Sequence, residues 1–235
     1  MEPCLRKLGI IGGMSWAATR IYFDELNRIV QRRVSASSSA PLLIENLDFA
    51  PIYRLTDEDD WSAAAVILSE SARRLEQAGA GALVIAANSM HRVYKQVAEA
   101  VDIPILHIAE CVGAQMAADG VKNAVLLGTR NVMTESFYRN RLIAHGIELL
   151  PPDMANVELV DSIIYDELML GKASRDAERD LKTIITLKAN EGAQAVVLAC
   201  TELEMVVDVD ANVLPIYDSA RIHARAAADW MLAAD

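Results

Sequence analysis

Short apolar runs and longer mixed segments follow one another along this chain in a regular order. The short runs are rich in Val, Ile, Leu and Ala, and each stops at small or polar residues, as buried parallel strands do. The stretches between them are predicted to be helical. The pattern predicts strands near residues 7–12, 41–47, 82–87, 104–107, 123–128, 147–150, 195–199 and 213–216, and helices near 16–34, 60–78, 91–100, 109–118, 133–145, 157–170, 174–191 and 219–233.

This alternation of strands and helices predicts an α/β protein whose mainly parallel sheet is covered by helices on both faces. The helix expected after Thr56 carries acidic residues in its first turn, which suits the positive end of its dipole. The serine-rich segment 35–39 is interpreted as a polar loop and not as a domain boundary.

One phrase occurs twice, as Ala82–Ser89 and as Ala195–Glu202, and in each copy an apolar run ends in small polar residues. Ala87 lies 75 positions after Gly12, and Cys200 lies 72 positions after Gly128. A Pro-Ile pair follows 17 positions after Ala87 and 15 positions after Cys200. The matched landmarks predict two similar lobes related by a pseudo-two-fold axis. The alternative is that all strand–helix–strand units look alike.

Composition narrows the classes of partner. The chain has 235 residues and a net charge of −11, and an acidic chain repels phosphate backbones, so no nucleic-acid partner is expected. No apolar run approaches the roughly 20 residues that cross a bilayer, so no membrane association is expected. Cys4, Cys111 and Cys200 are odd in number and fit no metal or disulfide spacing. With no signal peptide visible, we expect a cytoplasmic protein and no bound metal.

The strand ends carry the candidate chemistry, because ligands of open α/β sheets sit at that edge. Cys200 stands before a stretch that could open a helix, and a helix N-terminus lowers the pKa of a thiol. The alternative is a buried, inert cysteine. Asn88 and Ser89 mirror Thr201 and Glu202, and such groups at helix starts could hold a carboxylate or simply cap the helix.

Two further features lie close to the first strand ends. His91 follows within one turn and is a possible proton carrier, although a lone histidine is more often structural. The glycine-rich segment Gly12–Trp16 matches neither a dinucleotide-binding fingerprint nor a Walker loop. It allows close approach of backbone to a small ligand, or serves only as a tight strand-to-helix turn.

Several motifs then occur together and in order over nearly the full chain. They are Gly12-Gly13-Met14-Ser15-Trp16, Asn88-Ser89-Met90-His91, Leu106-His107-Ile108-Ala109, Leu127-Gly128-Thr129-Arg130, Phe137-Tyr138-Arg139, Cys200-Thr201-Glu202, Tyr217-Asp218-Ser219 and His223. As a set they resemble the aspartate/glutamate racemase family, within the wider Asp/Glu/hydantoin racemase group.

The resemblance implies two Rossmann-like lobes with the active site in the cleft between them. It implies lobe 1 from residues 1–104 and 212–235 and lobe 2 from residues 105–211. It also implies a cofactor-independent racemase that forms a homodimer, with an amino-acid or dicarboxylic substrate. In the family two thiols act on opposite faces of the substrate. Cys200 matches the second thiol, whereas Ala87 stands at the position of the first.

The resemblance also suggests binding residues. Asn88, Ser89 and Thr201 would hold the α-carboxylate of the substrate, and Thr129 is a further substrate-binding candidate. Met14 and Ser15 would line the pocket. His91 and Glu202 are possible proton relays. A side-chain carboxylate would need a cation, for which the candidates are Arg54, Arg130 and Lys172.

An alanine methyl group can neither accept nor donate a proton, so the match leaves three explanations open. A water, Ser89 or His91 could serve the face opposite Cys200. The reaction could need one thiol only, as in single-cysteine decarboxylases or isomerases of the same superfamily. Ala87 could also be a replacement that traps substrate without turnover. The leading hypothesis is an amino-acid racemase of the Asp/Glu type, and a non-catalytic amino-acid-binding protein is a further alternative.

Overall fold

The computed structural model describes residues 5–55 and 58–233, and these residues divide into two compact units. Unit 1 comprises residues 1–108 and 223–235, and unit 2 comprises residues 109–222. The lobe boundaries near 104 and 211 and the pseudo-two-fold axis stay predictions. Cys4 and Thr56 lie outside the described residues.

Unit 1 is built on a four-stranded parallel sheet with the strand order β2-β1-β3-β4. Its 3₁₀ helices η1 and η2 span Ala50–Ile52 and Ser89–Val93. Its strands are β1 (Leu8–Gly12), β2 (Leu42–Asn46), β3 (Ala82–Ile85) and β4 (Ile105–Leu106), and its helices are α1 (Trp16–Arg33), α2 (Glu58–Gln77), α3 (Tyr94–Ala98) and the later part of α9 (Ser219–Leu232).

Unit 2 repeats this topology with the parallel order β6-β5-β7-β8. A π-helix η3 (Ile163–Glu167) and two 3₁₀ helices, η4 (Leu168–Leu170) and η5 (Thr201–Met205), complete the unit. Its strands are β5 (Asn123–Gly128), β6 (Glu148–Leu149), β7 (Val196–Ala199) and β8 (Ile216–Asp218), and its α-helices are α4 (Ile108–Ala118), α5 (Arg130–Thr134), α6 (Ser136–Ala144), α7 (Met154–Ser162) and α8 (Arg175–Asn190).

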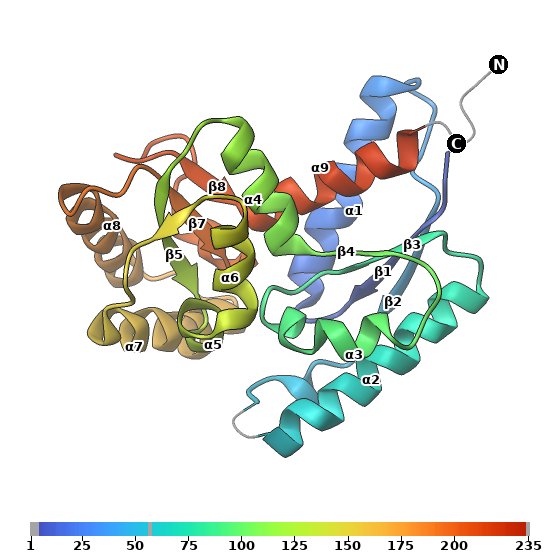
Figure 1. Ribbon diagram of the computed structural model, residues 1–235, viewed down its shortest axis with the longest axis horizontal. Helices are drawn as coiled ribbons and strands as arrows, with labels where there is room; N and C mark the ends of the chain where they lie inside the picture. Colours follow the sequence, from blue (N-terminus) through green and yellow to red (C-terminus); the bar gives the residue numbers. More distant parts are fainter. Residues whose placement is uncertain (1–4, 56–57, 234–235) are drawn as a thin grey trace. The chain divides into compact units, whose positions relative to one another are not determined.

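Helices cover both faces of the unit 1 sheet, as the alternating pattern predicts. A Cβ added at Gly9 would meet Leu83 and Leu75, so this face of β1 packs on α2. A Cβ added at Gly12 would meet Thr19, so the opposite face packs on α1. Figure 1 shows α2 and α3 on one side of this sheet and α1 and α9 on the other. The predicted α/β class with two similar parallel sheets is confirmed.

The two sheets are equivalent residue by residue at their carboxyl ends. Ile11 pairs with Ile85, which places Gly12 beside Ala86, and in unit 2 Gly128 pairs with Ala199. The next residue along each strand is therefore Ala87 in unit 1 and Cys200 in unit 2. The proline carbonyls agree with this register, because Pro104 accepts from the Leu83 amide and Pro215 accepts from the Val196 amide, each at 2.9 Å.

Some expected helices are broken or tighter than predicted. The helix expected over 91–100 begins as η2 and continues as α3. The helix expected over 133–145 is interrupted at Glu135, which has extended backbone angles. The helix expected over 157–170 changes from α7 into η3 and η4. Apolar spacing does not distinguish these helix types, because they differ by a fraction of a residue per turn.

Candidate functional site

Cys200 lies directly after β7 and belongs to the hydrophobic core of unit 2. Val196 and Leu198, the alternate residues of β7, are part of the same buried cluster, together with residues of α7 and α8. Cys200 is 6% exposed and precedes η5. The structure therefore places this cysteine at the carboxyl end of a buried parallel strand.

A carboxylate within the same turn faces the thiol. The Cys200 Sγ–H donates to Glu202 Oε2 at 3.2 Å, and the Thr201 hydroxyl donates to the same oxygen at 2.7 Å. Glu202 is itself buried. One carboxylate oxygen therefore collects two hydrogen bonds beside the candidate reactive atom.

The expected lowering of the thiol pKa by a helix N-terminus is wrong. Burial raises the pKa of the Cys200 thiol well above its usual value, and the charges of Glu202 and Asp161 act in the same direction. The following helix is a 3₁₀ turn of five residues, so it has little dipole to oppose these effects. Cys200 is consequently a protonated thiol at neutral pH, hydrogen-bonded to a carboxylate.

Ala87 occupies in unit 1 the position that Cys200 occupies in unit 2. Its side chain belongs to a buried apolar cluster that includes Met14 and Trp61. Its carbonyl is hydrogen-bonded to His91 Nδ1 at 2.9 Å. This strand end therefore presents a methyl group among apolar neighbours and offers no titratable atom at the position of a thiol.

His91 uses both ring nitrogens within unit 1. The Ile108 amide donates to His91 Nε2 at 3.2 Å, so Nδ1 carries the hydrogen and donates to the Ala87 carbonyl. The ring packs edge-on against His107 at 4.4 Å between centroids. His91 thus braces the end of β3 against the start of α4, and a proton relay through it stays a prediction that would have to break one of these bonds.

Asn88 and Ser89 lie at the start of η2, as their motif suggests. Asn88 is buried, and its carbonyl accepts from the His91 amide at 3.2 Å. Its side chain does not cap η2, so the capping interpretation is wrong for Asn88. Ser89 is half-buried at the first position of the turn. Their contact with a substrate carboxylate stays a prediction.

The glycine-rich segment forms a strand-to-helix turn. Met14 is buried in the apolar cluster of unit 1. The Ser15 hydroxyl caps α1 by accepting from the Ala18 amide at 3.4 Å. Both residues therefore have structural roles, and a role for either in binding substrate stays a prediction.

Thr129 supplies unit 2 with a buried hydroxyl at the end of β5, the strand that neighbours β7. Gly128 pairs with Ala199. Thr129 and Cys200 are the next residues, so they lie at the ends of two neighbouring strands. Thr129 is 5% exposed, its side chain does not cap α5, and within the described part of the chain its Oγ1 has no hydrogen-bond partner. A buried hydroxyl of this kind is suited to a ligand.

The three candidate cations differ in their surroundings. Arg54 is exposed, in the loop after η1, and Lys172 is exposed after Gly171, which has a left-handed backbone conformation. The Arg130 amide donates to Asp161 Oδ1 at 2.7 Å, and its guanidinium lies 3.7 Å from Glu158. Arg130 is thus held against α7, and all that distinguishes Arg54 and Lys172 here is their exposure.

Sequence reasoning missed two groups around Cys200. Asp161 comes from α7, and Glu204 is held by Arg221 at 3.0 Å. Neither lies in a recognisable motif. Glu204 is on η5 itself, whereas Asp161 is brought in by the packing of α7 and the Arg221 partner of Glu204 by the first turn of α9. Across residues 5–55 and 58–233 there is no cluster of side chains suited to a metal ion. The same residues contain no helix with the length and apolarity to span a membrane.

Comparisons with known proteins agree on one family. The family model for Asp/Glu/hydantoin racemases matches residues 11–227. A crystal structure of a provisionally named Asp/Glu racemase from Yersinia pestis is 37% identical, with a TM-score of 0.89 over 97% of this chain and 100% of that one. An aspartate racemase homologue from Pyrococcus horikoshii is 30% identical, with a TM-score of 0.82 over 97% and 99%. The broad specificity amino-acid racemase RacX of Bacillus subtilis is 25% identical over 96% of this chain and 98% of its own.

Proposed function

Because this chain belongs to the Asp/Glu/hydantoin racemase family, we propose that it transfers protons at the α-carbon of an amino acid without a cofactor. Aspartate and glutamate are the first substrates to test. The observation that carries the proposal is the buried Cys200–Glu202 pair at the end of β7. A homodimer and a cytoplasmic location stay predictions.

The pair supplies an acid and a base in one turn. Glu202 accepts the thiol proton, and the resulting thiolate accepts the proton from the substrate Cα, leaving a carbanion stabilised by the α-carboxylate. In the reverse direction the thiol returns a proton to the carbanion, and Glu202 restores the thiol. Burial raises the pKa of the thiol, so the thiolate formed in this exchange is a stronger base toward the proton on Cα.

The motifs shared with the family supply the proposed binding groups. The hydroxyls of Thr129 and Thr201 and the polar groups of Asn88 and Ser89 would hold the α-carboxylate. A substrate with a second carboxylate would use the exposed cations Arg54 and Lys172. Arg130, whose guanidinium lies 3.7 Å from Glu158, is the third candidate.

Ala87 makes the proposed chemistry one-sided. Racemisation needs a proton acceptor and a proton donor on opposite faces of the carbanion, and loss of one positioned group costs about 10²–10⁴ in rate. We therefore propose that Cys200 exchanges the α-proton of one enantiomer with retention of configuration. Interconversion of the two enantiomers should be much slower than this exchange.

The test is to incubate each pure enantiomer of aspartate and glutamate with the protein in deuterated water. Proton NMR follows α-deuteration, and chiral chromatography follows inversion. We expect deuteration of one enantiomer without inversion. In Cys200→Ala we expect the rate of deuteration to fall by a factor of about 10²–10⁴. Ala87→Cys supplies a thiol at the position of the family's first thiol and should give interconversion of both enantiomers.

Two results would contradict these proposals in different ways. Fast interconversion by the unaltered protein would show that another group serves the face at Ala87, which overturns the one-sided mechanism. No exchange of any of the four amino acids, by either the unaltered protein or Ala87→Cys, would overturn the function itself.

The single thiol also favours a second candidate reaction. A decarboxylase that protonates a planar intermediate on one face needs one acid only, and Cys200 alone would suffice. Carbon dioxide release from substituted malonates that is abolished in Cys200→Ala would support it. A protein that only binds amino acids would instead show a ligand-induced rise in melting temperature with neither exchange nor decarboxylation.

A further inference from the structure

At each of the two equivalent strand ends, the residue four positions further along the chain bonds the turn to a following helix. Ala87 and Cys200 are equivalent in register, so His91 in unit 1 corresponds to Glu204 in unit 2. Each of these residues reaches the first turn of the helix that follows the last strand of its sheet. The helix that follows the unit 1 sheet is α4, whose first residue Ile108 belongs to unit 1, and the helix that follows the unit 2 sheet is α9, whose first turn belongs to unit 2.

The tie in unit 1 is electrically neutral. His91 accepts from the Ile108 amide at the start of α4 and donates to the Ala87 carbonyl. No charged group takes part in these two bonds. This turn carries no thiol, so its tie has only a geometric role.

The tie in unit 2 is ionic. Arg221 Nη2 donates to Glu204 Oε2 at 3.0 Å, and Arg221 Nε lies 3.2 Å from Asp218 Oδ2. The other Asp218 oxygen accepts from the Ala220 and Arg221 amides at 3.0 and 3.2 Å. The turn that carries Glu202 and follows Cys200 is thus clamped by a guanidinium between two carboxylates.

This clamp adds charge to the turn that carries Glu202, the residue whose carboxylate accepts from the thiol. The charged groups that act on the Cys200 thiol are Glu202 on η5 and Asp161 on α7, and the Arg130 amide on α5 holds Asp161. Tyr165 on η3 packs against the same core cluster. Glu204 on η5, Asp218 at the end of β8 and Arg221 on α9 form the clamp, and Glu204 in turn acts on Glu202. Burial raises the pKa of Glu204 and of Asp218, and Arg221 opposes that rise in both. Arg221 therefore favours the ionised form of the carboxylates behind the Cys200 turn.

We propose that Glu204 and Arg221 are positioning residues for Cys200, holding its turn in place and setting how readily the thiol ionises. The proposal rests on the proposed function, in which the thiol gives up and takes back a proton. It assigns opposite electrostatic effects to the two members of one contact. Glu204 disfavours a thiolate, and Arg221 favours it.

Thiol titration of Arg221→Gln and Glu204→Gln tests the assignment. The rate of alkylation of Cys200 by iodoacetamide is followed from pH 6 to 11 by peptide mass spectrometry, which separates Cys200 from the other cysteines. Thiolate absorbance, measured against Cys200→Ala, gives a second titration that needs no reagent access. Below the thiol pKa, we expect about three- to tenfold slower alkylation in Arg221→Gln and about three- to tenfold faster alkylation in Glu204→Gln.

Matched variants separate charge from packing. Arg221→Lys keeps the cation and should recover most of the rate lost in Arg221→Gln. Arg179→Gln removes an arginine from an exposed ion-pair cluster on α8 and should leave the Cys200 profile unchanged. Far-ultraviolet circular dichroism and melting temperature show whether each variant is folded.

If the alkylation rate of Cys200 changed in the same direction in Arg221→Gln and in Glu204→Gln, the contact would act through structure alone. This result would overturn the proposal. Unchanged profiles in both would overturn it as well. Alkylation needs no turnover, so these outcomes are distinct from a failure of the deuterium-exchange test, which addresses the function.

Discussion

At the scale of single residues, Gly13 shows how the chain accommodates the strand-to-helix turn. Its φ is +89°, and a Cβ added there would lie 2.2 Å from the Leu47 carbonyl oxygen. Its amide donates to the Thr19 hydroxyl at 2.8 Å. The sequence predicts a tight turn from the glycine pair, but only the structure shows that the neighbouring backbone leaves no room for a side chain.

Gly13→Ala should therefore lower the free energy of unfolding by more than the roughly 1–3 kcal/mol expected from a left-handed backbone conformation alone. Gly79→Ala is a matched control in the same unit, because its φ is +92° and only the end of Lys7, at 3.9 Å, lies near the added Cβ. Urea unfolding of both variants measures the difference. Equal losses of unfolding free energy in the two variants would contradict this prediction, because the close approach to Leu47 would then add nothing to the backbone strain.

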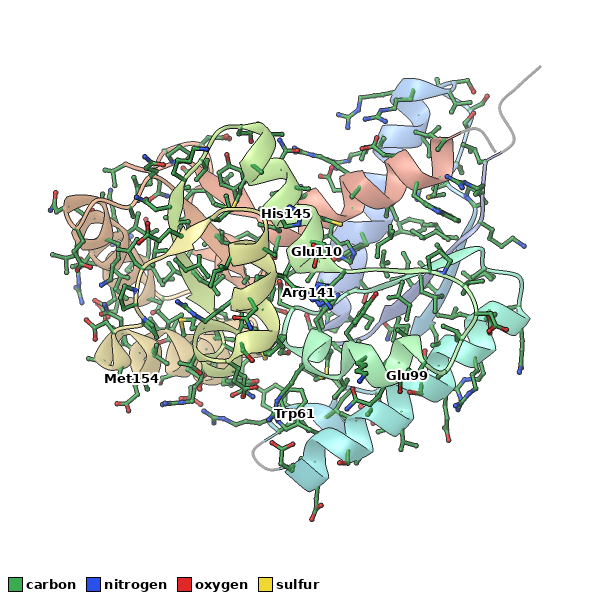
Figure 2. The ribbon with its side chains drawn as sticks, viewed as in Figure 1. Trp61, Glu99, Glu110, Arg141, His145 and Met154 are labelled. Carbon is green, nitrogen blue, oxygen red and sulfur yellow. The ribbon has the colours of Figure 1, made fainter. Side chains whose placement is uncertain are left out.

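At the scale of elements, α4 and α6 are joined by a polar clamp that follows no motif. Glu110 on α4 accepts from Arg141 at 2.6 Å and lies 2.7 Å from His145 Nε2. Figure 2 shows these three side chains together where α4 and α6 meet. Gly113 makes room for the His145 ring, because an added Cβ would lie 2.5 Å from the ring. Helix periodicity predicts both elements, but it cannot predict which residues of one helix face the other.

Gly113→Ala should destabilise unit 2, although alanine is intrinsically favoured over glycine in a helix by about 1 kcal/mol. The clash with the His145 ring is the reason, so the sign should reverse when the ring is removed. In a His145→Ala background the same substitution should be neutral or stabilising by up to about 1 kcal/mol. A four-protein cycle of unfolding free energies measures this coupling, and equal destabilisation in both backgrounds would contradict it.

At the scale of the whole molecule, the chain returns at its C-terminal end to complete unit 1. His223 on α9 accepts from the Tyr22 hydroxyl at 2.7 Å through Nδ1 and donates to the Leu106 carbonyl at 3.0 Å through Nε2. The ring is fully buried. Burial, with the neighbouring His91, lowers the pKa of His223 to about 3. The C-terminal helix is therefore fixed in unit 1 by an imidazole that must stay neutral.

This arrangement makes stability fall in acid. Below its ordinary pKa of about 6.5 the unfolded His223 binds a proton, whereas the folded His223 does not until the pH nears 3. The unfolded state binds more protons in this window, so this residue contributes a loss of up to about 1.4 kcal/mol per pH unit as the pH falls. His223→Gln should remove that slope between pH 6 and 4 in urea unfolding. An unchanged slope would contradict the assignment.

The sequence by itself determined the α/β class, the repeated topology and the place of Ala87 and Cys200 at equivalent strand ends. These follow from local patterns, because a buried strand needs a continuous apolar run and its end is marked by the first small polar residues. Helix boundaries were less well predicted, as Glu135 and the 3₁₀ start at Ser89 show.

Only the tertiary structure decided what kind of thiol Cys200 is. Its sequence context predicts a lowered pKa, whereas the structure raises it, because acidity depends on burial and on charges a few ångströms away. Of the two groups that supply those charges, Glu202 is near Cys200 in sequence. Asp161 comes from α7, and only folding brings it, and the Arg221 that holds Glu204, to the turn where the chemistry is proposed.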